Sequence, residues 1–279
     1  VFLSSLFYRK GLSIIAEGSA SSPKKKKAVR VYEGQSIDLN KSFLKIELKT
    51  LTNTPTMLIN SVIGVVLAPI MIIFVMGNSF FSESGADGVG AVGFGVYLIA
   101  LMAGVSNQVA MVGFSREGKN LLVLKSLPIS ATMLVKIKLL AATMISSLTV
   151  LAAMIAYIIV SPSHNVLIAL MMGIVSLSCA FGANCIALYY DLKNPNLRWQ
   201  NINEIMKNNR KALRPVLITT GIGIAYFIGG LILEMSAPIP NFWKHFIFDA
   251  LCLAVNVVFI VFSYKKLFSD PEGMINSIE

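Results

Sequence analysis

Charged side chains are scarce in this chain of 279 residues: they make up 14% of it, whereas 55% of the residues are hydrophobic. A soluble domain carries about 25% charged residues. The sequence also has no GxxxxGK[ST], HExxH or GxSxG motif, and its three cysteines form no CxxC pair. These absences predict that the chain is not an enzyme, has no metal site or disulfide framework, and does not itself bind ATP through a P-loop.

Long apolar runs make up much of the sequence. Six segments approach the roughly 20 residues that a bilayer core requires. Five of them contain no Asp, Glu, Lys or Arg, and the sixth contains only Asp249, so core helices of a soluble protein are a poor explanation. The sequence predicts an all-α polytopic membrane protein with spans over Met57–Met76, Val89–Gly113, Leu139–Val160, Val166–Tyr190, Val216–Leu233 and Phe246–Ser263.

The placement of basic residues predicts an orientation. Of the 24 Lys and Arg residues, all but Lys244 fall on one side of the six-span arrangement. Basic loops stay in the cytoplasm. We therefore expect both termini and two long inner loops to be cytoplasmic, with short outer loops over 77–88, 161–165 and 234–245, which leaves no room for a large extracellular domain.

Two segments precede the first span. Residues 1–40 read as the end of a preceding span followed by a basic linker, SSPKKKKAVR, typical of a solvated tail that could also attract anionic lipid. No aromatic residues alternate with its lysines, which argues against nucleic-acid binding. Residues 41–56 place three lysines on one helix face and predict an interfacial helix that ends at an elbow near Pro55. Residues 57–268 form the predicted transmembrane domain and 269–279 a cytoplasmic tail.

Polar residues inside the spans are candidates for a translocation path. They are Asn107, Gln108, Asn184 and the acid Asp249. Hydrogen bonding between packed helices is the alternative explanation for the amides. Asp249 lies close enough to the outer edge that it could simply reach water.

Two motifs occupy the inner loops. In SREGKNLLVLKSLPIS (residues 115–130) we expect a short helix that Ser115 caps and Pro128 ends. Its leucines spread around the helix, a pattern that favours contact with partners over a position on open water. The second loop, DLKNPNLRWQNINEIMKNN (191–209), combines turn residues, Trp199 and a basic amphipathic segment.

Taken together, the two motifs resemble the permease subunits of bacterial type-2 ATP-binding-cassette exporters, over roughly residues 24–266. The resemblance implies that a separate cytoplasmic ATPase, which binds ATP and Mg²⁺, pushes on a coupling helix of the permease. It also implies a bacterial inner (plasma) membrane location and a second six-span half or permease copy, of which this chain would be the C-terminal half. The matching coupling residues are Ser115, Arg116, Glu117, Gly118, Lys119, Leu127 and Pro128. Arg116 and Glu117 are the expected specificity contacts with the ATPase. The second cytoplasmic motif matches at Asp191, Asn194, Pro195, Trp199, Asn201 and Glu204.

Two other functions remain open at this point. A secondary transporter or channel would need ionisable groups at mid-membrane or broken helices in matching halves, and the sequence offers only Asp249. A membrane-embedded enzyme would need His, Asp or Cys residues converging at one depth, which their distribution along the sequence does not provide.

The predicted orientation can be tested by cysteine labelling in intact cells. A cysteine at Ser82 lies in a predicted outer loop, so a membrane-impermeant maleimide should label it. A cysteine at Ser126 lies in a predicted inner loop and should react only after the cells are permeabilised. The reverse pattern of labelling would contradict the orientation.

Overall fold

The computed structural model describes residues 39–77, 89–105, 107–118, 120–126, 129–161, 165–199, 204–205, 213–235 and 241–278. Within these ranges every regular element is a helix. The predicted basic linker, most of the predicted outer loops over 77–88 and 161–165, and residues 236–240 of the third loop lie outside the described residues.

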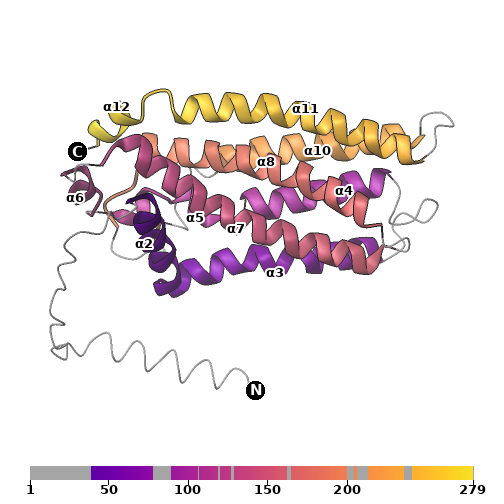
Figure 1. The fold of residues 1–279 in the computed structure, drawn as a ribbon, viewed down its shortest axis with the longest axis horizontal. Coiled ribbons are helices and arrows are strands. Elements are labelled where there is room, and N and C mark those ends of the chain that lie inside the picture. The colour runs from indigo at the N-terminus through magenta and orange to yellow at the C-terminus, as the bar shows by residue number, and fades with distance from the viewer. Residues whose placement is uncertain are drawn as a thin grey trace, which may run out of the picture. The chain divides into compact units, whose positions relative to one another are not determined.

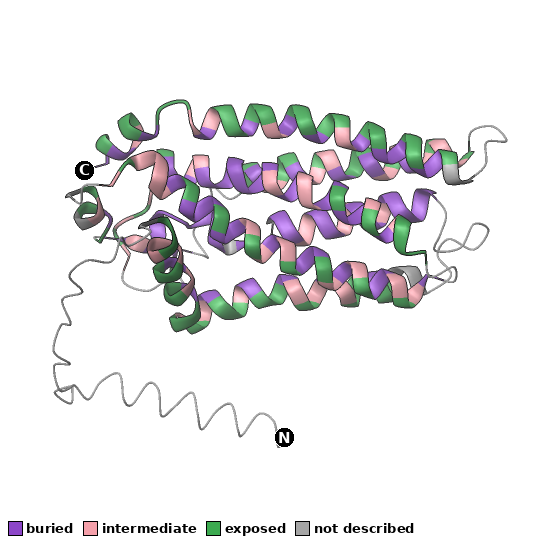
Figure 2. Ribbon diagram, in the orientation of Figure 1, coloured by how far each residue is buried: buried purple, intermediate pink, exposed green. Residues whose placement is uncertain are grey.

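Five helices are long and apolar enough to cross a membrane. They lie side by side in one bundle (Figure 1), and exposed residues, green in Figure 2, occur along all of them. Many of these exposed residues are apolar, such as Phe74 and Ile159. A protein whose outward-facing helix surfaces are apolar matches lipid rather than water, so this is an all-α membrane protein. The five helices are α3 (Pro55–Gly77), α7 (Ala131–Val160), α8 (Val166–Lys193), α10 (Leu213–Met235) and α11 (Asn241–Leu267).

The second predicted span is not one continuous helix. Helix α4 (Val89–Ala100) passes into a π-helical turn, η2 (Leu101–Val105), and a further short helix, α5 (Gln108–Met111), follows. Between them the Nδ2 atom of Asn107 donates to the carbonyl oxygen of Ala142 on α7, at 2.7 Å. Hydrogen bonds from side chains to neighbouring helices stabilise such interruptions. The six-span prediction is therefore confirmed for five spans, and the remaining segment is an interrupted apolar helix.

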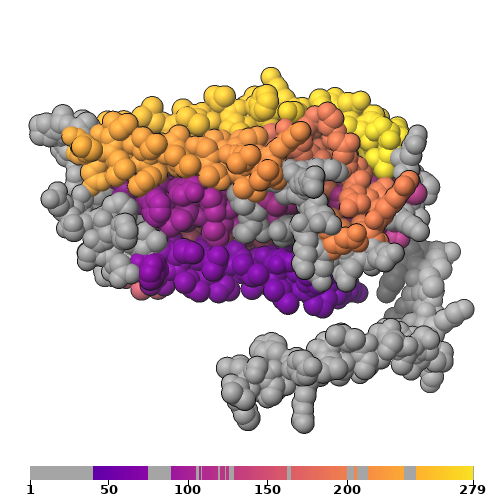
Figure 3. Space-filling model, turned by 180° about the vertical axis from the view of Figure 1, so that it is seen from behind, coloured from indigo at the N-terminus to yellow at the C-terminus, as the bar shows by residue number. Residues whose placement is uncertain are grey.

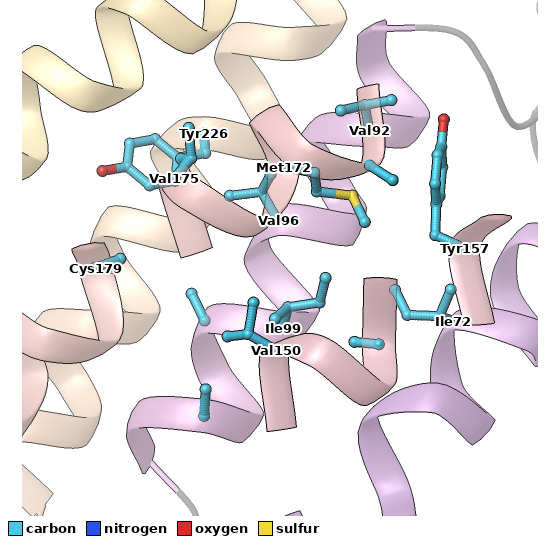
Figure 4. Close-up of a cluster of buried hydrophobic side chains, with 14 of the residues drawn as sticks. Ile72, Val92, Val96, Ile99, Val150, Tyr157, Met172, Val175, Cys179 and Tyr226 are labelled. Atoms are coloured by element: carbon cyan, nitrogen blue, oxygen red, sulfur yellow. The ribbon is translucent and has the colours of Figure 1, made fainter. Parts of the chain in front are cut away.

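Glycines allow α4 to pack closely against α10. A Cβ atom on Gly93 would lie 3.0 Å from the carbonyl oxygen of Tyr226, and one on Gly230 would lie 2.9 Å from that of Val89. Small residues let helix backbones approach in this way. The core that results draws side chains from α3, α4, α7, α8, α10 and α11, and Figure 4 labels Ile72, Val92, Val96, Ile99, Val150, Tyr157, Met172, Val175, Cys179 and Tyr226.

Three shorter helices gather at one end of the bundle, where α7 begins and α8 and α11 end (Figure 1). They are α2 (Leu39–Asn53), α6 (Asn120–Ser126) and α12 (Pro271–Asn276). We call this the basic end, because exposed lysines such as Lys41, Lys45 and Lys49 belong to it.

Helix α2 agrees with the helix predicted over 41–56. Its three lysines are all exposed, as their shared face predicts. The chain bends at Thr54, and Pro55 opens α3 at a position where the missing N–H of proline breaks no helical hydrogen bond. The elbow prediction is confirmed.

Helix α7 begins eight residues earlier than the predicted span. Ser130 caps it by accepting a hydrogen bond from the backbone N–H of Met133, at 3.3 Å. The added turns carry Lys136, which is exposed, and Lys138, which is buried among acidic side chains. Hydropathy places the start of the span after these charges, whereas the helix itself begins before them.

Two neighbouring glycines of α10 test the close packing of α4. Replacing Gly230 with alanine should lower the free energy of unfolding by about 1–3 kcal/mol, because its new Cβ atom meets rigid backbone. Gly229→Ala is the matched control: nothing lies within 4 Å of its Cβ position, so stability should hold or rise. Thermal unfolding of the two purified variants in detergent makes the comparison, and equal melting temperatures would contradict it.

Candidate functional site

The two inner-loop motifs meet at the basic end. Asp191, in the last turn of α8, accepts hydrogen bonds from the backbone N–H groups of Phe114 at 2.6 Å and Ser115 at 3.0 Å. The hydroxyl of Ser115 donates to the other oxygen of the same carboxylate. These N–H groups open a 3₁₀ turn, η3 (Ser115–Glu117), and have no helical partner of their own. A buried carboxylate therefore fixes the start of the first motif from the second.

The second motif holds the same turn from its other side. The backbone N–H of Asn196 donates to the Ser115 hydroxyl at 2.9 Å, and the Trp199 indole donates to the Ser115 carbonyl at 2.8 Å. Gly118 ends the turn with φ at +53°, a conformation that favours glycine. A Cβ atom there would also lie 3.2 Å from the Trp199 ring. The predicted motif residues thus make specific contacts with one another.

Charged side chains from α2 and α7 complete the site. Arg116 forms an ion pair with Glu47 of α2. The ammonium of Lys138 lies 2.6 Å from a carboxylate oxygen of Glu117 and 3.4 Å from one of Glu47. The side chains of Arg116 and Lys138 are only 3% and 1% exposed. We call these residues, with Ser115 and Asp191, the polar junction.

The polar junction balances opposite charges away from water. Burial alone would raise the pKa of Glu117, but the charge and hydrogen bond of Lys138 and the charge of Arg116 outweigh burial and lower it. Burial lowers the pKa of Arg116, and the nearby carboxylates of Glu117 and Asp191 oppose that effect. Removing one charge would leave the others unpaired, which is costly in a buried site. The junction is therefore a strong link between α2, η3, α7 and α8.

The expected coupling residues divide into two groups. Ser115, Arg116, Glu117 and Gly118 belong to the junction or its edge, whereas Lys119, Leu127 and Pro128 lie outside the described residues. The expected capping role of Ser115 is wrong, because its hydroxyl bonds Asp191 and α6 begins only at Asn120. Contact of Arg116 and Glu117 with a partner stays a prediction; in this structure both side chains point inward. Among the described side chains of α6, Asn120, Leu122 and Lys125 are exposed.

Only part of the second motif lies at the polar junction. Asp191 and Trp199 contact the junction directly, and Asn194 and Pro195 make the turn that follows α8. Glu204 is helical and exposed, and Asn201 lies outside the described residues, as does most of the predicted amphipathic segment.

Sequence reasoning missed Glu47 and Lys138. Glu47 is the one acid among the lysines of α2, and Lys138 sits at the edge of an apolar span. Each differs from its neighbours in the sequence, Glu47 in the sign of its charge and Lys138 in being charged at all. Nothing local, however, indicated that the two would meet across 91 residues of sequence.

The first motif also comes close to a phosphate-binding loop. GFSREGKN (113–120) satisfies GxxxxGK and then has Asn where a P-loop has Ser or Thr. A P-loop follows a strand and turns its backbone N–H groups toward phosphate. Here an interrupted apolar helix precedes the stretch, and Asp191 accepts from the N–H groups of Phe114 and Ser115. The geometry described here therefore does not form a phosphate cradle.

Two of the expected translocation-path residues bond each other instead. Asn107 and Asn184 are buried, their side chains meet at 3.2 Å, and both donate to the hydroxyl of Ser146. That hydroxyl donates in turn to the carbonyl oxygen of Ala103, beside the π-helical turn. These contacts match the alternative explanation, hydrogen bonding between packed helices. The side chain of Gln108 lies outside the described residues.

Asp249 lies apart from the amides, on α11. It is 5% exposed, and neither carboxylate oxygen has a hydrogen-bond partner among the described residues. His245, expected in a loop, belongs to the same helix and is also buried. The described residues hold no metal-binding cluster of His, Cys, Asp or Glu, and the three cysteines are free and buried.

Comparisons with known proteins found no match to a family model, to a curated protein or to a solved structure.

Replacing Asp191 with asparagine tests the junction. The amide keeps the shape but has one acceptor oxygen instead of two and no charge, so either the two N–H groups or the Ser115 hydroxyl loses its acceptor, and unfolding should become easier by about 2–3 kcal/mol. Glu272→Gln makes the same chemical change at an exposed position of α12 and should stay within about 0.5 kcal/mol of the parent. Equal unfolding midpoints of the two variants in detergent would contradict a stabilising role of Asp191.

Proposed function

We propose that this chain is the membrane-spanning permease subunit of an ATP-driven exporter, and that the energy comes from a separate cytoplasmic ATPase that binds ATP and Mg²⁺. One observation carries the proposal: a short exposed helix, α6, is tied through the polar junction to three helices of the bundle. A force applied to α6 therefore acts on the bundle as a whole.

The connection from α6 to the bundle is short and stiff. The backbone N–H of Leu121 bonds the carbonyl of Gly118 at 3.1 Å, and Gly118 directly follows η3. The Leu121 side chain is buried in a core cluster with residues of α7, α8 and α12, whereas Leu122 is 46% exposed. One face of α6 thus holds the bundle and the other is free for a partner.

The basic end of the bundle fits the cytoplasmic side. It carries exposed lysines of α2, α6 and α7, and basic residues stay inside during membrane insertion. A cytoplasmic ATPase would reach α6 on this side. The same orientation places both termini inside the cell, in a plasma membrane or bacterial inner membrane. A second six-span half or a second permease copy would complete the translocation path.

The rival proposal, a secondary transporter or channel, draws on the broken helix at η2 and on Asp249. Discontinuous helices form ion sites in transporters when their free backbone groups line a cavity. Asn107 and Asn184 instead fill that region with bonds to Ser146 and to each other. Asp249 lies on another helix, so the described residues do not gather at one mid-membrane site. The exporter is the better-supported function.

The partner can be tested with one exposed position on α6. Leu122→Asp should leave stability unchanged but weaken binding of the neighbouring gene's ATPase at least about tenfold, because a buried charge disfavours an apolar contact. Val166→Asp makes the same change at the first residue of α8, at the opposite end, where an acid suits the helix N-terminus. This control should bind normally.

Co-purification of the ATPase and ATP-driven transport in vesicles are the two measurements. Failure of the unaltered chain to bind any such ATPase, or ion-driven transport without ATP, would contradict the proposal. Equal binding of the ATPase by Leu122→Asp and Val166→Asp would contradict the coupling role of α6.

A further inference from the structure

A cavity of about 520 Å³ separates α10 from α11. These two helices follow each other in sequence, yet α10 packs chiefly on α4 and α11 on α8. They run side by side at the surface of the bundle, α10 in orange and α11 in yellow in Figure 3. Three exposed residues of its lining, Ile232, Leu251 and Val255, lie on the lipid-facing surface. The cavity therefore opens to the bilayer.

The walls of the cavity offer almost no hydrogen bonds. Gly221 and Gly229 leave open space where other residues would carry side chains, and Phe248 and Leu251 face them from α11. The only hydroxyl is that of Tyr226, which lies 2.5 Å from the side-chain oxygen of Asn256. It is thus engaged within the protein. A ligand of this cavity must be hydrocarbon along its length.

Dimensions select between a lipid chain and another helix. The lining on α10 runs from Gly221 to Leu233, which is about 18 Å at 1.5 Å per residue and so roughly half of a 30 Å bilayer core. An α-helix of that length, about 10 Å wide, occupies on the order of 1,400 Å³. A hydrocarbon chain at carbon contact distances of about 4 Å occupies roughly 300 Å³. The cavity has room for a hydrocarbon chain and is too small to enclose a helix.

Lys244, which is 9% exposed, lies one helical turn before Phe248, the first residue of α11 that lines the cavity. The ammonium of Lys244 donates to the carbonyl oxygen of Glu234 at 3.1 Å, and Glu234 directly follows the lining residue Leu233. A lysine carries three donors, and no other described residue accepts from this one. Trp243 beside it is 54% exposed, as is typical of aromatic residues at a membrane interface. Among the described residues, Lys244 is the only Lys or Arg at the end opposite the basic end, and His245 follows it on α11.

We propose that this cavity binds a hydrocarbon chain of an anionic phospholipid from the leaflet where α10 ends and α11 begins, with its phosphate against Lys244. The proposal is independent of the exporter function. It gives a role to the one Lys or Arg that departs from the distribution of basic residues along the chain. The length and apolar walls of the cavity select a hydrocarbon tail, and the ammonium of Lys244 selects a negatively charged headgroup.

Filling the cavity tests the site directly. Gly229→Phe places a ring in space that holds no atom within 4 Å of the new Cβ, so the fold should tolerate it. Ile228→Phe is the control, on an exposed residue of the same helix that does not line the cavity. The purified full chain is stripped of lipid in detergent and titrated with phosphatidylglycerol, and bound lipid is counted by native mass spectrometry.

We expect Gly229→Phe to weaken phosphatidylglycerol binding roughly tenfold or more and Ile228→Phe to bind like the parent. Lys244→Gln should weaken phosphatidylglycerol but leave diacylglycerol with the same chains unchanged. Equal lipid binding by the two phenylalanine variants would overturn the site. A shift of Gly229→Phe from dimer to monomer would also overturn it, by assigning the cavity to a second copy of the chain. If Lys244→Gln lost binding of both phosphatidylglycerol and diacylglycerol, the assignment of Lys244 to the headgroup would be overturned.

Discussion

The contact between Asp191 and the start of η3 is the constraint on which the basic end of this protein depends. One carboxylate accepts from two backbone N–H groups and from the Ser115 hydroxyl, so it fixes where the apolar helix ahead of η3 stops. That position in turn aims Arg116 and Glu117 at Glu47 and Lys138. Helix α6 follows directly. The arrangement of four helices thus follows from a single acid at the end of α8.

Sequence reasoning predicted what depends on neighbours in the chain. Hydropathy located five spans, and the elbow at Pro55 followed from backbone chemistry. The break before Asn107 could not be predicted, because the groups that stabilise it lie on α7 and α8. The two inner-loop motifs were identified as a pair, but their bonds through Ser115 required knowledge of which helix ends meet. Pairing of Glu47 with Arg116 has the same non-local origin.

Polar groups in this bundle serve two different purposes. Inside the membrane region, Asn107, Ser146 and Asn184 satisfy one another and hold an interrupted helix against its neighbours. At the basic end, full charges replace amides, and the buried cations Arg116 and Lys138 each lie against a carboxylate. Exact partners matter at both places. Between α10 and α11, by contrast, the absence of polar groups leaves the bilayer itself as the natural occupant.

The separation of Ser115 and Asp191 along the chain has a consequence for biosynthesis. The acceptor follows the donor by 76 positions, so at about 5–20 residues per second the ribosome needs roughly 4–15 seconds to supply the second after the first. During that interval, Glu47 is already available to Arg116 and Glu117. Lys138 is synthesised partway through the interval, and Asp191 only at its end. The nascent segment must wait in water, beside the membrane, until α8 has been inserted. Completion of the junction therefore marks the arrival of the fourth long apolar segment.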